Sequence, residues 1–173
     1  MSKAARDDGK GFQVFRAADA LSLSEAGCMA VEPFDPATLA AVSQLREAGY
    51  GGGGQVRVLV NIPGFSLTHV WFKSGYPLPL HSHDADCLYY VVAGSLQLGT
   101  QALGPRDSFF VPCDAAYTYQ VGPDGVELLE FRHANAFNFV NRAKNPAFWS
   151  KAIEAVKANR DAWRTEKMPA LNT

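Results

Sequence analysis

The segment HSHDADC, residues 81–87, decides how the rest of the chain is interpreted. It stands directly before 88–93, a run with the composition of a β-strand. Alternate side chains of a strand share a face, so His81 and His83 are expected to point the same way, with Cys87 beside them if the alternation continues. Neutral imidazoles arranged in this way can bind one zinc, iron, nickel or copper ion together. The segment therefore predicts a metal site on a strand.

Short apolar runs recur from residue 55 to about residue 139, and turn-forming residues such as glycine and proline separate them. The runs are 56–62, 66–73, 88–93, 95–98, 108–111, 117–121 and 126–132. Short, closely spaced strands with this punctuation are typical of an antiparallel sandwich or barrel. The sequence therefore predicts an all-β fold.

Two helices are predicted outside the barrel, and both begin with the same signal. Asp35-Pro36 and Asn145-Pro146 each place a capping side chain before a proline, which suits the first helical position. Gly49 is expected to end the first helix. The predicted organisation is an N-terminal extension over 1–54 with a helix at about 36–48, the barrel over 55–140, and a C-terminal helix and tail over 141–173.

Two stretches of the N-terminal extension carry weaker signals. The glycine run 51–54 predicts a flexible link, because four glycines are costly to order. A phosphate-binding loop is the sharper alternative, but the Gly-Lys-Ser/Thr ending and the following helix are missing. The apolar residues Phe12, Val14 and Phe15 predict the start of a further strand.

Composition excludes several classes of function. The 173 residues suit one domain, 47% of them are hydrophobic, and 16 basic residues nearly balance 17 acidic ones. A nucleic-acid partner is not expected, because it requires a basic face. A membrane partner is not expected either, because no apolar stretch is long enough to span a bilayer. The N-terminus lacks the apolar core of a signal peptide, and three widely spaced cysteines are no disulfide framework, so a cytoplasmic location is expected.

The spacing around the histidines resembles the first sequence motif of the cupin superfamily, G-x5-H-x-H-x3/4-E-x6-G. Gly75, His81, His83 and Gly94 match this motif, and Cys87 stands where the motif has glutamate. The second cupin motif, G-x5-P-x-G-x2-H-x3-N, resembles the stretch GPRDSFFVPCDAAYTYQ only loosely. In that stretch Tyr117 takes the place of the histidine. The resemblance covers about half of the chain.

The resemblance implies a double-stranded β-helix, in which the two motif histidines, the glutamate and the second-motif histidine bind one metal ion. Carried over by position, His81, His83 and Cys87 would bind a divalent transition metal (zinc, iron or nickel), and Tyr117 would be a weak ligand, a hydrogen-bond donor or a proton carrier. Oxygenase, isomerase and lyase chemistries occur in such families, so a metal-dependent enzyme acting on a small organic molecule is expected. The resemblance also implies a homodimer.

A second interpretation remains open at this point. The site has then decayed, Cys87 is a small buried hydrophobe, and the protein is a binding or sensing module without catalysis. Under either interpretation Tyr89, Tyr119 and His133 are the expected substrate-binding residues. An apolar pocket with the phenol groups of the tyrosines suits a hydrophobic or aromatic molecule. His133 is the spare imidazole that could line the barrel interior, and an ordinary hydrogen-bonded histidine is the alternative.

The remaining polar residues are less informative. Asp84 and Asp86 have the opposite parity to the histidines, so a regular strand directs them away from the metal. His69, Arg57, Glu127 and Glu130 lie on predicted strands whose register is not visible in the sequence, and each is allowed on either face.

Overall fold

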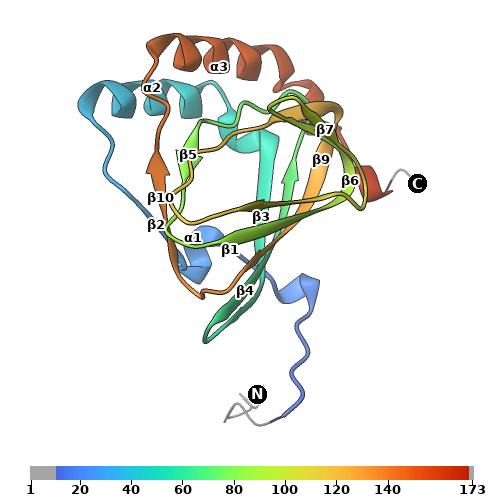
Figure 1. Ribbon diagram of the computed structural model, residues 1–173. Coiled ribbons are helices and arrows are strands. Elements are labelled where there is room, and N and C mark those ends of the chain that lie inside the picture. The colour runs from blue at the N-terminus through green and yellow to red at the C-terminus, as the bar shows by residue number, and fades with distance from the viewer. Residues whose placement is uncertain (1–10, 172–173) are drawn as a thin grey trace, which may run out of the picture.

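The computed structural model describes residues 11–171, and the ends of the predicted extension and tail, 1–10 and 172–173, lie outside the described residues. Most of the strands form one sheet (Figure 1). They are β1 (Leu21–Ser22), β3 (Gly54–Ile62), β4 (Phe65–Phe72), β6 (Cys87–Leu98), β7 (Gln101–Leu103), β8 (Ser108–Val111) and β9 (Gln120–Arg132). Their spatial order is β1-β3-β4-β9-β6-β7, with β8 also paired to β6, and every pairing is antiparallel.

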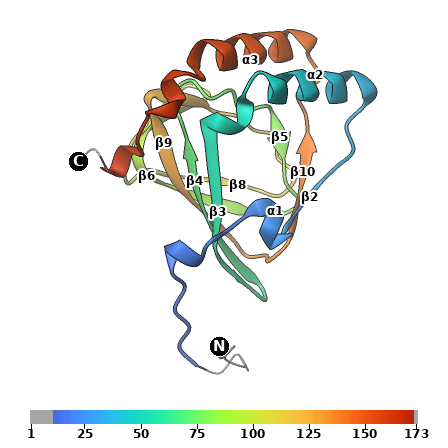
Figure 2. The same cartoon turned by 180° about the vertical axis from the view of Figure 1, so that it is seen from behind.

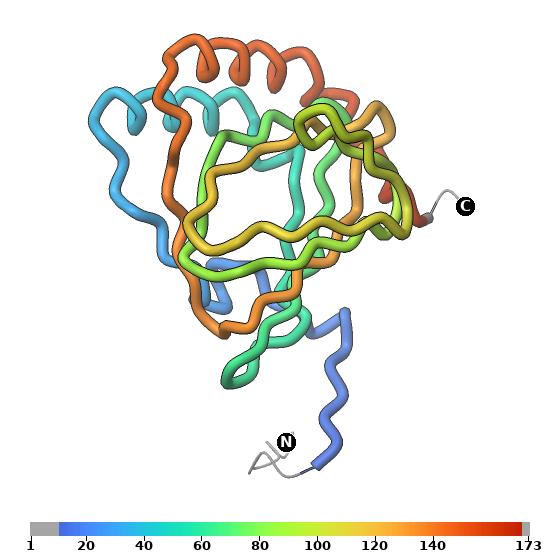
Figure 3. Tube along the Cα trace, viewed as in Figure 1, coloured from blue at the N-terminus to red at the C-terminus, as the bar shows by residue number. Residues whose placement is uncertain are grey.

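A second, three-stranded sheet faces the first and carries the histidine segment. It has the order β2-β10-β5, where β2 is Met29–Val31, β5 is His81–Ser82 and β10 is Phe137–Asn141. The trace in Figure 3 shows the strands curving around a common interior. The predicted all-β barrel is therefore confirmed.

Two long helices lie side by side at one end of the barrel (Figures 1 and 2). Helix α2 is Pro36–Glu47 and helix α3 is Pro146–Asn159, whereas α1 is only Leu23–Ala26. Both predicted caps are confirmed: Asp35 Oδ1 accepts a hydrogen bond from the Thr38 N–H at 2.8 Å, and Asn145 Oδ1 accepts one from the Ala147 N–H at 2.9 Å. Between residues 11 and 171, none of the helices combines the length and the apolar composition that crossing a bilayer requires.

The glycine run is ordered structure, so the prediction of a flexible link is wrong. It forms the short 3-10 helix η2 (Tyr50–Gly53) and the first residue of β3. A Cβ atom at Gly53 would lie 2.5 Å from the ring of Trp163 and 2.7 Å from the ring of Tyr76. Glycine is needed here because the backbone passes directly against two aromatic rings.

The C-terminal segment packs beside η2 and the turn at Ser74. It contains the 3-10 helices η3 (Ala162–Arg164) and η4 (Pro169–Leu171). The buried indole of Trp163 donates a hydrogen bond to the Ser74 carbonyl at 2.9 Å, and Glu166 accepts hydrogen bonds from both the N–H and the hydroxyl of Ser74. The predicted strand at Phe12, Val14 and Phe15 is wrong, because the first strand of the described chain begins at Leu21 and these three side chains are exposed.

The strand register determines which side chains enter the barrel. Glu130 of β9 pairs with Thr68 of β4 on one side and with Tyr89 of β6 on the other, and Arg132 pairs with Cys87. Thr68, Tyr89 and Cys87 are buried, so this set faces inward. Glu127 has the opposite parity and lies on the outer face, where it is buried against His69 and the C-terminal segment.

Candidate functional site

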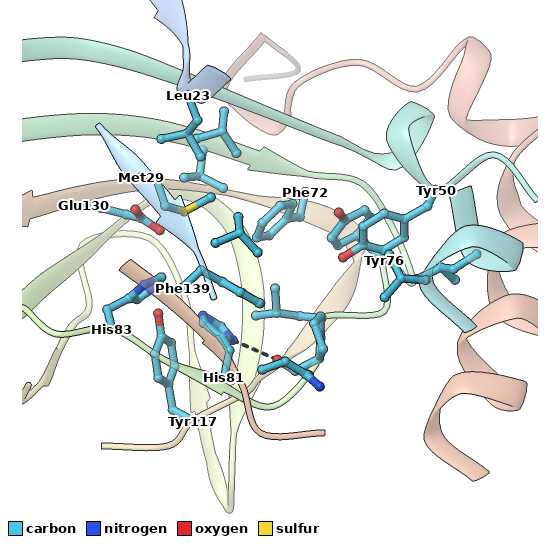
Figure 4. A pocket seen from close by; sticks show the side chains of 18 of the residues that line it. Leu23, Met29, Tyr50, Phe72, Tyr76, His81, His83, Tyr117, Glu130 and Phe139 are labelled. Atoms are coloured by element: carbon cyan, nitrogen blue, oxygen red, sulfur yellow. Dashed lines mark hydrogen bonds between the residues drawn. The ribbon is translucent and has the colours of Figure 1, made fainter. Parts of the chain in front are cut away.

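A cavity of about 310 Å³ lies between the two sheets and helices α2 and α3. Most of its lining is apolar or aromatic, and this volume is at the small end of the range for small-molecule sites. Figure 4 shows His81, His83, Tyr117 and Glu130 on one side of the cavity and Phe72, Tyr50 and Tyr76 on the other. The cavity therefore has a polar end and an apolar, aromatic end.

The two motif histidines meet at the polar end. His81 belongs to β5 and His83 follows it, and both side chains line the cavity while being nearly buried. Their ring centroids lie 5.0 Å apart. The backbone of His81 exchanges hydrogen bonds with that of Tyr117 at 3.1 and 2.9 Å, which joins the two motif regions directly. The sequence-based prediction that the two imidazoles point into one space agrees with this geometry.

Backbone carbonyl groups fix the orientation of both rings. Nδ1 of His81 lies 2.8 Å from the Pro79 carbonyl oxygen, and Nδ1 of His83 hydrogen-bonds to the Asn138 carbonyl oxygen. A carbonyl oxygen can only accept, so each Nδ1 carries the proton and each Nε2 presents a lone pair. Within residues 11–171, neither Nε2 has a hydrogen-bonding partner. This is the arrangement that metal-binding histidines have in proteins.

Burial keeps both imidazoles neutral. It lowers the pKa of His81 to about 4 and lowers the pKa of His83 below its ordinary value. The Glu130 carboxylate lies near enough to act on both rings in the opposite direction, but its effect is smaller than that of burial. At neutral pH both rings are therefore ready to act as ligands without first losing a proton.

Tyr89 and Tyr117 form a hydrogen-bonded pair at the polar end of the cavity. Tyr117 and Tyr119 line the cavity, whereas Tyr89 is fully buried behind Tyr117 and its hydroxyl hydrogen-bonds to the Tyr117 hydroxyl. Burial raises the pKa of both Tyr89 and Tyr117 well above the ordinary value. Tyr117 is therefore a neutral phenol at physiological pH, suited to donating a hydrogen bond.

Cys87 lies on the inner face of β6 but is not among the residues that line the cavity. Its thiol is 3.9 Å from the Leu88 carbonyl oxygen, and burial, followed by the nearby Glu130, raises its pKa to about 12. In the part of the chain that the structure describes, no three His, Cys, Asp or Glu side chains are grouped closely enough to hold an ion. The structure brings together two of the three predicted ligands, and the role of Cys87 stays a prediction.

Of the other predicted site residues, some lie elsewhere. His133 is exposed beyond the end of β9 and does not line the cavity. Asp84 and Asp86 hold a turn: each accepts a backbone hydrogen bond at 2.7 Å, from Asn138 and from Cys113 respectively. This agrees with the predicted direction of the two carboxylates, away from the two histidines.

Strand β9 contributes two functional candidates that sequence reasoning left undecided or missed. Glu130 and Arg132 both line the cavity, and Nη1 of Arg132 donates to Oε2 of Glu130 at 2.7 Å. The Arg132 side chain is 1% exposed, and its guanidinium lies 4.1 Å from the ring centroid of Phe137. Once the burial of Val126 and Leu128 is known, alternation along β9 places both residues on the inner face.

Comparisons with known proteins identify the fold. No protein-family model and no curated protein sequence matches the chain. A protein of unknown function with a cupin-like fold from Ralstonia eutropha JMP134 is 14% identical over 88% of this chain and 90% of its own, with a TM-score of 0.50. The polyketide cyclase RemF from Streptomyces resistomycificus is 19% identical over 61% of this chain and 82% of its own, with a TM-score of 0.51. An RmlC-like cupin from Shewanella frigidimarina NCIMB 400 is 28% identical over 47% of this chain and 77% of its own, with a TM-score of 0.43.

Proposed function

The chain has the cupin fold, and from that premise we propose that it binds a divalent transition metal through His81 and His83 and acts on a small organic molecule. One observation carries the proposal: both imidazoles are anchored through Nδ1 and leave Nε2 free in the same cavity. Zinc, iron and nickel all accept neutral imidazole. When bound, such an ion supplies Lewis-acid polarisation of a substrate oxygen.

The side chains around the polar end suit an oxygen-bearing substrate. Tyr117 is a neutral phenol next to His81, with ring centroids 4.4 Å apart, so its hydroxyl can donate a hydrogen bond to a carbonyl or hydroxyl oxygen bound there. At the far side, Phe72 stacks on Tyr76 with centroids 4.5 Å apart, which provides an apolar surface for the body of the molecule. The substrate class we infer is a compact, largely apolar or aromatic compound with a carbonyl or hydroxyl group at one end.

Metal titration of the purified protein tests the proposal. The metal-stripped wild type should take up about one equivalent of zinc or nickel, and the double variant His81→Ala, His83→Ala should lose at least about 100-fold in affinity, because both ligands are gone. The variant His133→Ala is the matched control, since this imidazole is exposed outside the cavity. Uptake of less than a tenth of an equivalent by the wild type, or unchanged affinity in the double variant, would contradict the proposal.

A binding or sensing module without catalysis is the second candidate. It is favoured by the absence, within residues 11–171, of any group of three side chains able to hold an ion. This alternative predicts that aromatic carbonyl compounds bind equally well to metal-stripped and metal-loaded protein. Isothermal titration of both forms with the same compound separates the two candidates.

We also propose that the protein forms a homodimer through the outer face of the large sheet. Several apolar side chains are exposed on that face, and Leu88 lies beside Phe110 in the β6–β8 pairing. Phe110 is 59% exposed, which is unusual for a phenylalanine on a strand of a monomer. Light scattering should give the mass of a dimer for the wild type and of a monomer for Phe110→Lys. A monomeric wild type would contradict this proposal alone.

A further inference from the structure

Two imidazoles leave the proposed metal site one protein ligand short. Catalytic metal sites normally have three protein ligands and an open position. The residue at the position of the motif glutamate is Cys87, which does not line the cavity. The strand register shows what occupies the neighbouring inward positions: Cys87 pairs with Arg132, and Tyr89 pairs with Glu130.

Glu130 is a carboxylate with half of its hydrogen-bonding capacity unused. It lines the same cavity as His81 and His83, and Figure 4 shows it on the same side of that cavity. Its Oε2 accepts the hydrogen bond from Arg132, whereas its Oε1 has no partner in the described part of the chain. A carboxylate held through one oxygen, with the other facing a cavity, is a common arrangement around metals, where ligating carboxylates are themselves hydrogen-bonded.

We propose that Glu130 is the third ligand of the metal and takes over the role that the cupin motif gives to a glutamate at position 87. The proposal rests on the proposed function, because it assumes that His81 and His83 bind the ion. The carboxylate must turn about its side-chain torsions to reach both histidines, since no three such side chains within residues 11–171 are grouped closely enough as they lie. The resulting set of two imidazoles and one carboxylate suits iron(II) with open positions.

Arg132 is the positioning residue of this set. Its guanidinium is buried between Glu130 and the ring of Phe137, so the hydrogen bond to Oε2 limits how far the carboxylate can turn. The Nε of Arg132 is buried and has no hydrogen-bonding partner in the described chain. The local charges also fit: the carboxylate and the guanidinium cancel, and the neutral histidines add none, so a dication brings the site to a net charge of about +2. A substrate carrying negative charge at its polar end would be favoured.

Cobalt(II) is the probe for the test, because its visible spectrum reports both affinity and ligand type. Glu130→Gln should lower cobalt affinity at least about 100-fold and change the visible bands, because an amide replaces a charged ligand. Glu127→Gln is the matched control: it lies on the same strand but faces outward against His69, and its affinity should stay within about twofold of the wild type. The wild-type complex should show no sulfur-to-cobalt charge-transfer band.

Two further variants protect the test against misfolding, which Glu130→Gln risks by leaving a buried guanidinium unpaired. The double variant Glu130→Gln, Arg132→Gln removes both charges and should lose as much affinity as the single variant. Arg132→Gln alone keeps the carboxylate, so its cobalt affinity should fall only about tenfold. Its visible bands should shift in position but keep the wild-type pattern. Circular dichroism checks that each variant is folded.

The outcomes separate the two proposals. If the wild type binds cobalt and Glu130→Gln binds it equally well, the role of Glu130 is overturned and the histidine site stands. A sulfur-to-cobalt band that disappears in Cys87→Ser would likewise replace Glu130 by the cysteine. If the wild type binds no cobalt, both proposals fail together.

Discussion

Histidines occupy two contrasting regions of this barrel. On the inner face, His81 and His83 bind backbone carbonyl groups through Nδ1 and leave Nε2 free. On the outer face, Nε2 of His69 is 2.7 Å from the Glu127 carboxylate, and the second oxygen of Glu127 accepts a hydrogen bond from the Ala170 N–H at 3.3 Å. The outer imidazole is therefore paired with the carboxylate that also holds the C-terminal segment against the sheet.

The difference gives a criterion for separating a proposed metal ligand from a structural histidine. All three rings are partly or wholly buried and lie on or next to strands, so burial alone does not distinguish them. What distinguishes them is where the free ring nitrogen lies, because a metal can bind either nitrogen of an imidazole. His81 and His83 line one cavity together, whereas His69 does not line it. By this criterion the inner pair is available for chemistry and the outer ring is not.

The largest expected effect is on metal-dependent stability. A metal that binds only the folded protein should stabilise the wild type by about 2.7 kcal/mol when its free concentration is 100 times its Kd. His81→Ala should lose nearly all of this increment, whereas His69→Ala should retain it even though it starts from a lower melting temperature. Thermal unfolding with and without zinc measures both quantities. If the zinc-induced increment falls equally in the two variants, the distinction between the inner and outer rings is wrong.

The next largest expected effect is the loss of stability when the contact between His69 and Glu127 is broken in the metal-free protein. Replacing Glu127 with alanine removes the partner of His69 and the acceptor for Ala170, and it should lower the free energy of unfolding by about 1 to 3 kcal/mol. Cobalt affinity should not change. Urea unfolding of Glu127→Ala, His69→Ala and the double variant gives the coupling energy between the two side chains. A coupling energy near zero would mean that their contact contributes nothing to holding the C-terminal segment.

Much of the fold could be predicted from the sequence, because its signals are local. The helix caps at Asp35 and Asn145 depend on side chains within three residues of the backbone that they bind. The strands were visible as short runs between turns. The glycine run was misinterpreted because its cause is distant in the chain: the rings of Trp163 and Tyr76 need the space that a side chain at Gly53 would fill.

The candidate site was only partly predictable for the same reason. The histidine pair is two residues apart, so local alternation was enough to place both rings in one cavity. The choice between the inner Glu130 and the outer Glu127 depends on the register between β9 and β6, which is set by residue pairs 23 to 45 positions apart in the chain. Position 87 matched the motif in number, but its side chain does not reach the cavity.

The smallest expected effect is a difference in thiol reactivity between the buried Cys87 and the exposed Cys113. Cys113 is exposed, and Cys87 is 2% exposed with its pKa raised to about 12. At pH 8 the thiolate fraction of Cys87 should therefore be roughly three orders of magnitude below that of an ordinary cysteine, and burial blocks access as well. Disulfide-exchange reagents should modify Cys113 first because it is exposed, although the neighbouring Asp114 raises its pKa, and this reaction should disappear in Cys113→Ser.

The pH dependence and the effect of metal sharpen this last prediction. A thiol pKa of about 12 means that the thiolate fraction rises about tenfold per pH unit, so labelling of Cys87 should still increase with pH above pH 9, where an ordinary thiol levels off. If Cys87 does not bind the ion, adding cobalt should leave its labelling rate in mild denaturant unchanged once the gain in global stability is corrected for. Protection that exceeds the gain in stability would place the sulfur in the coordination sphere, and the inner face would then use the cysteine where we propose a carboxylate.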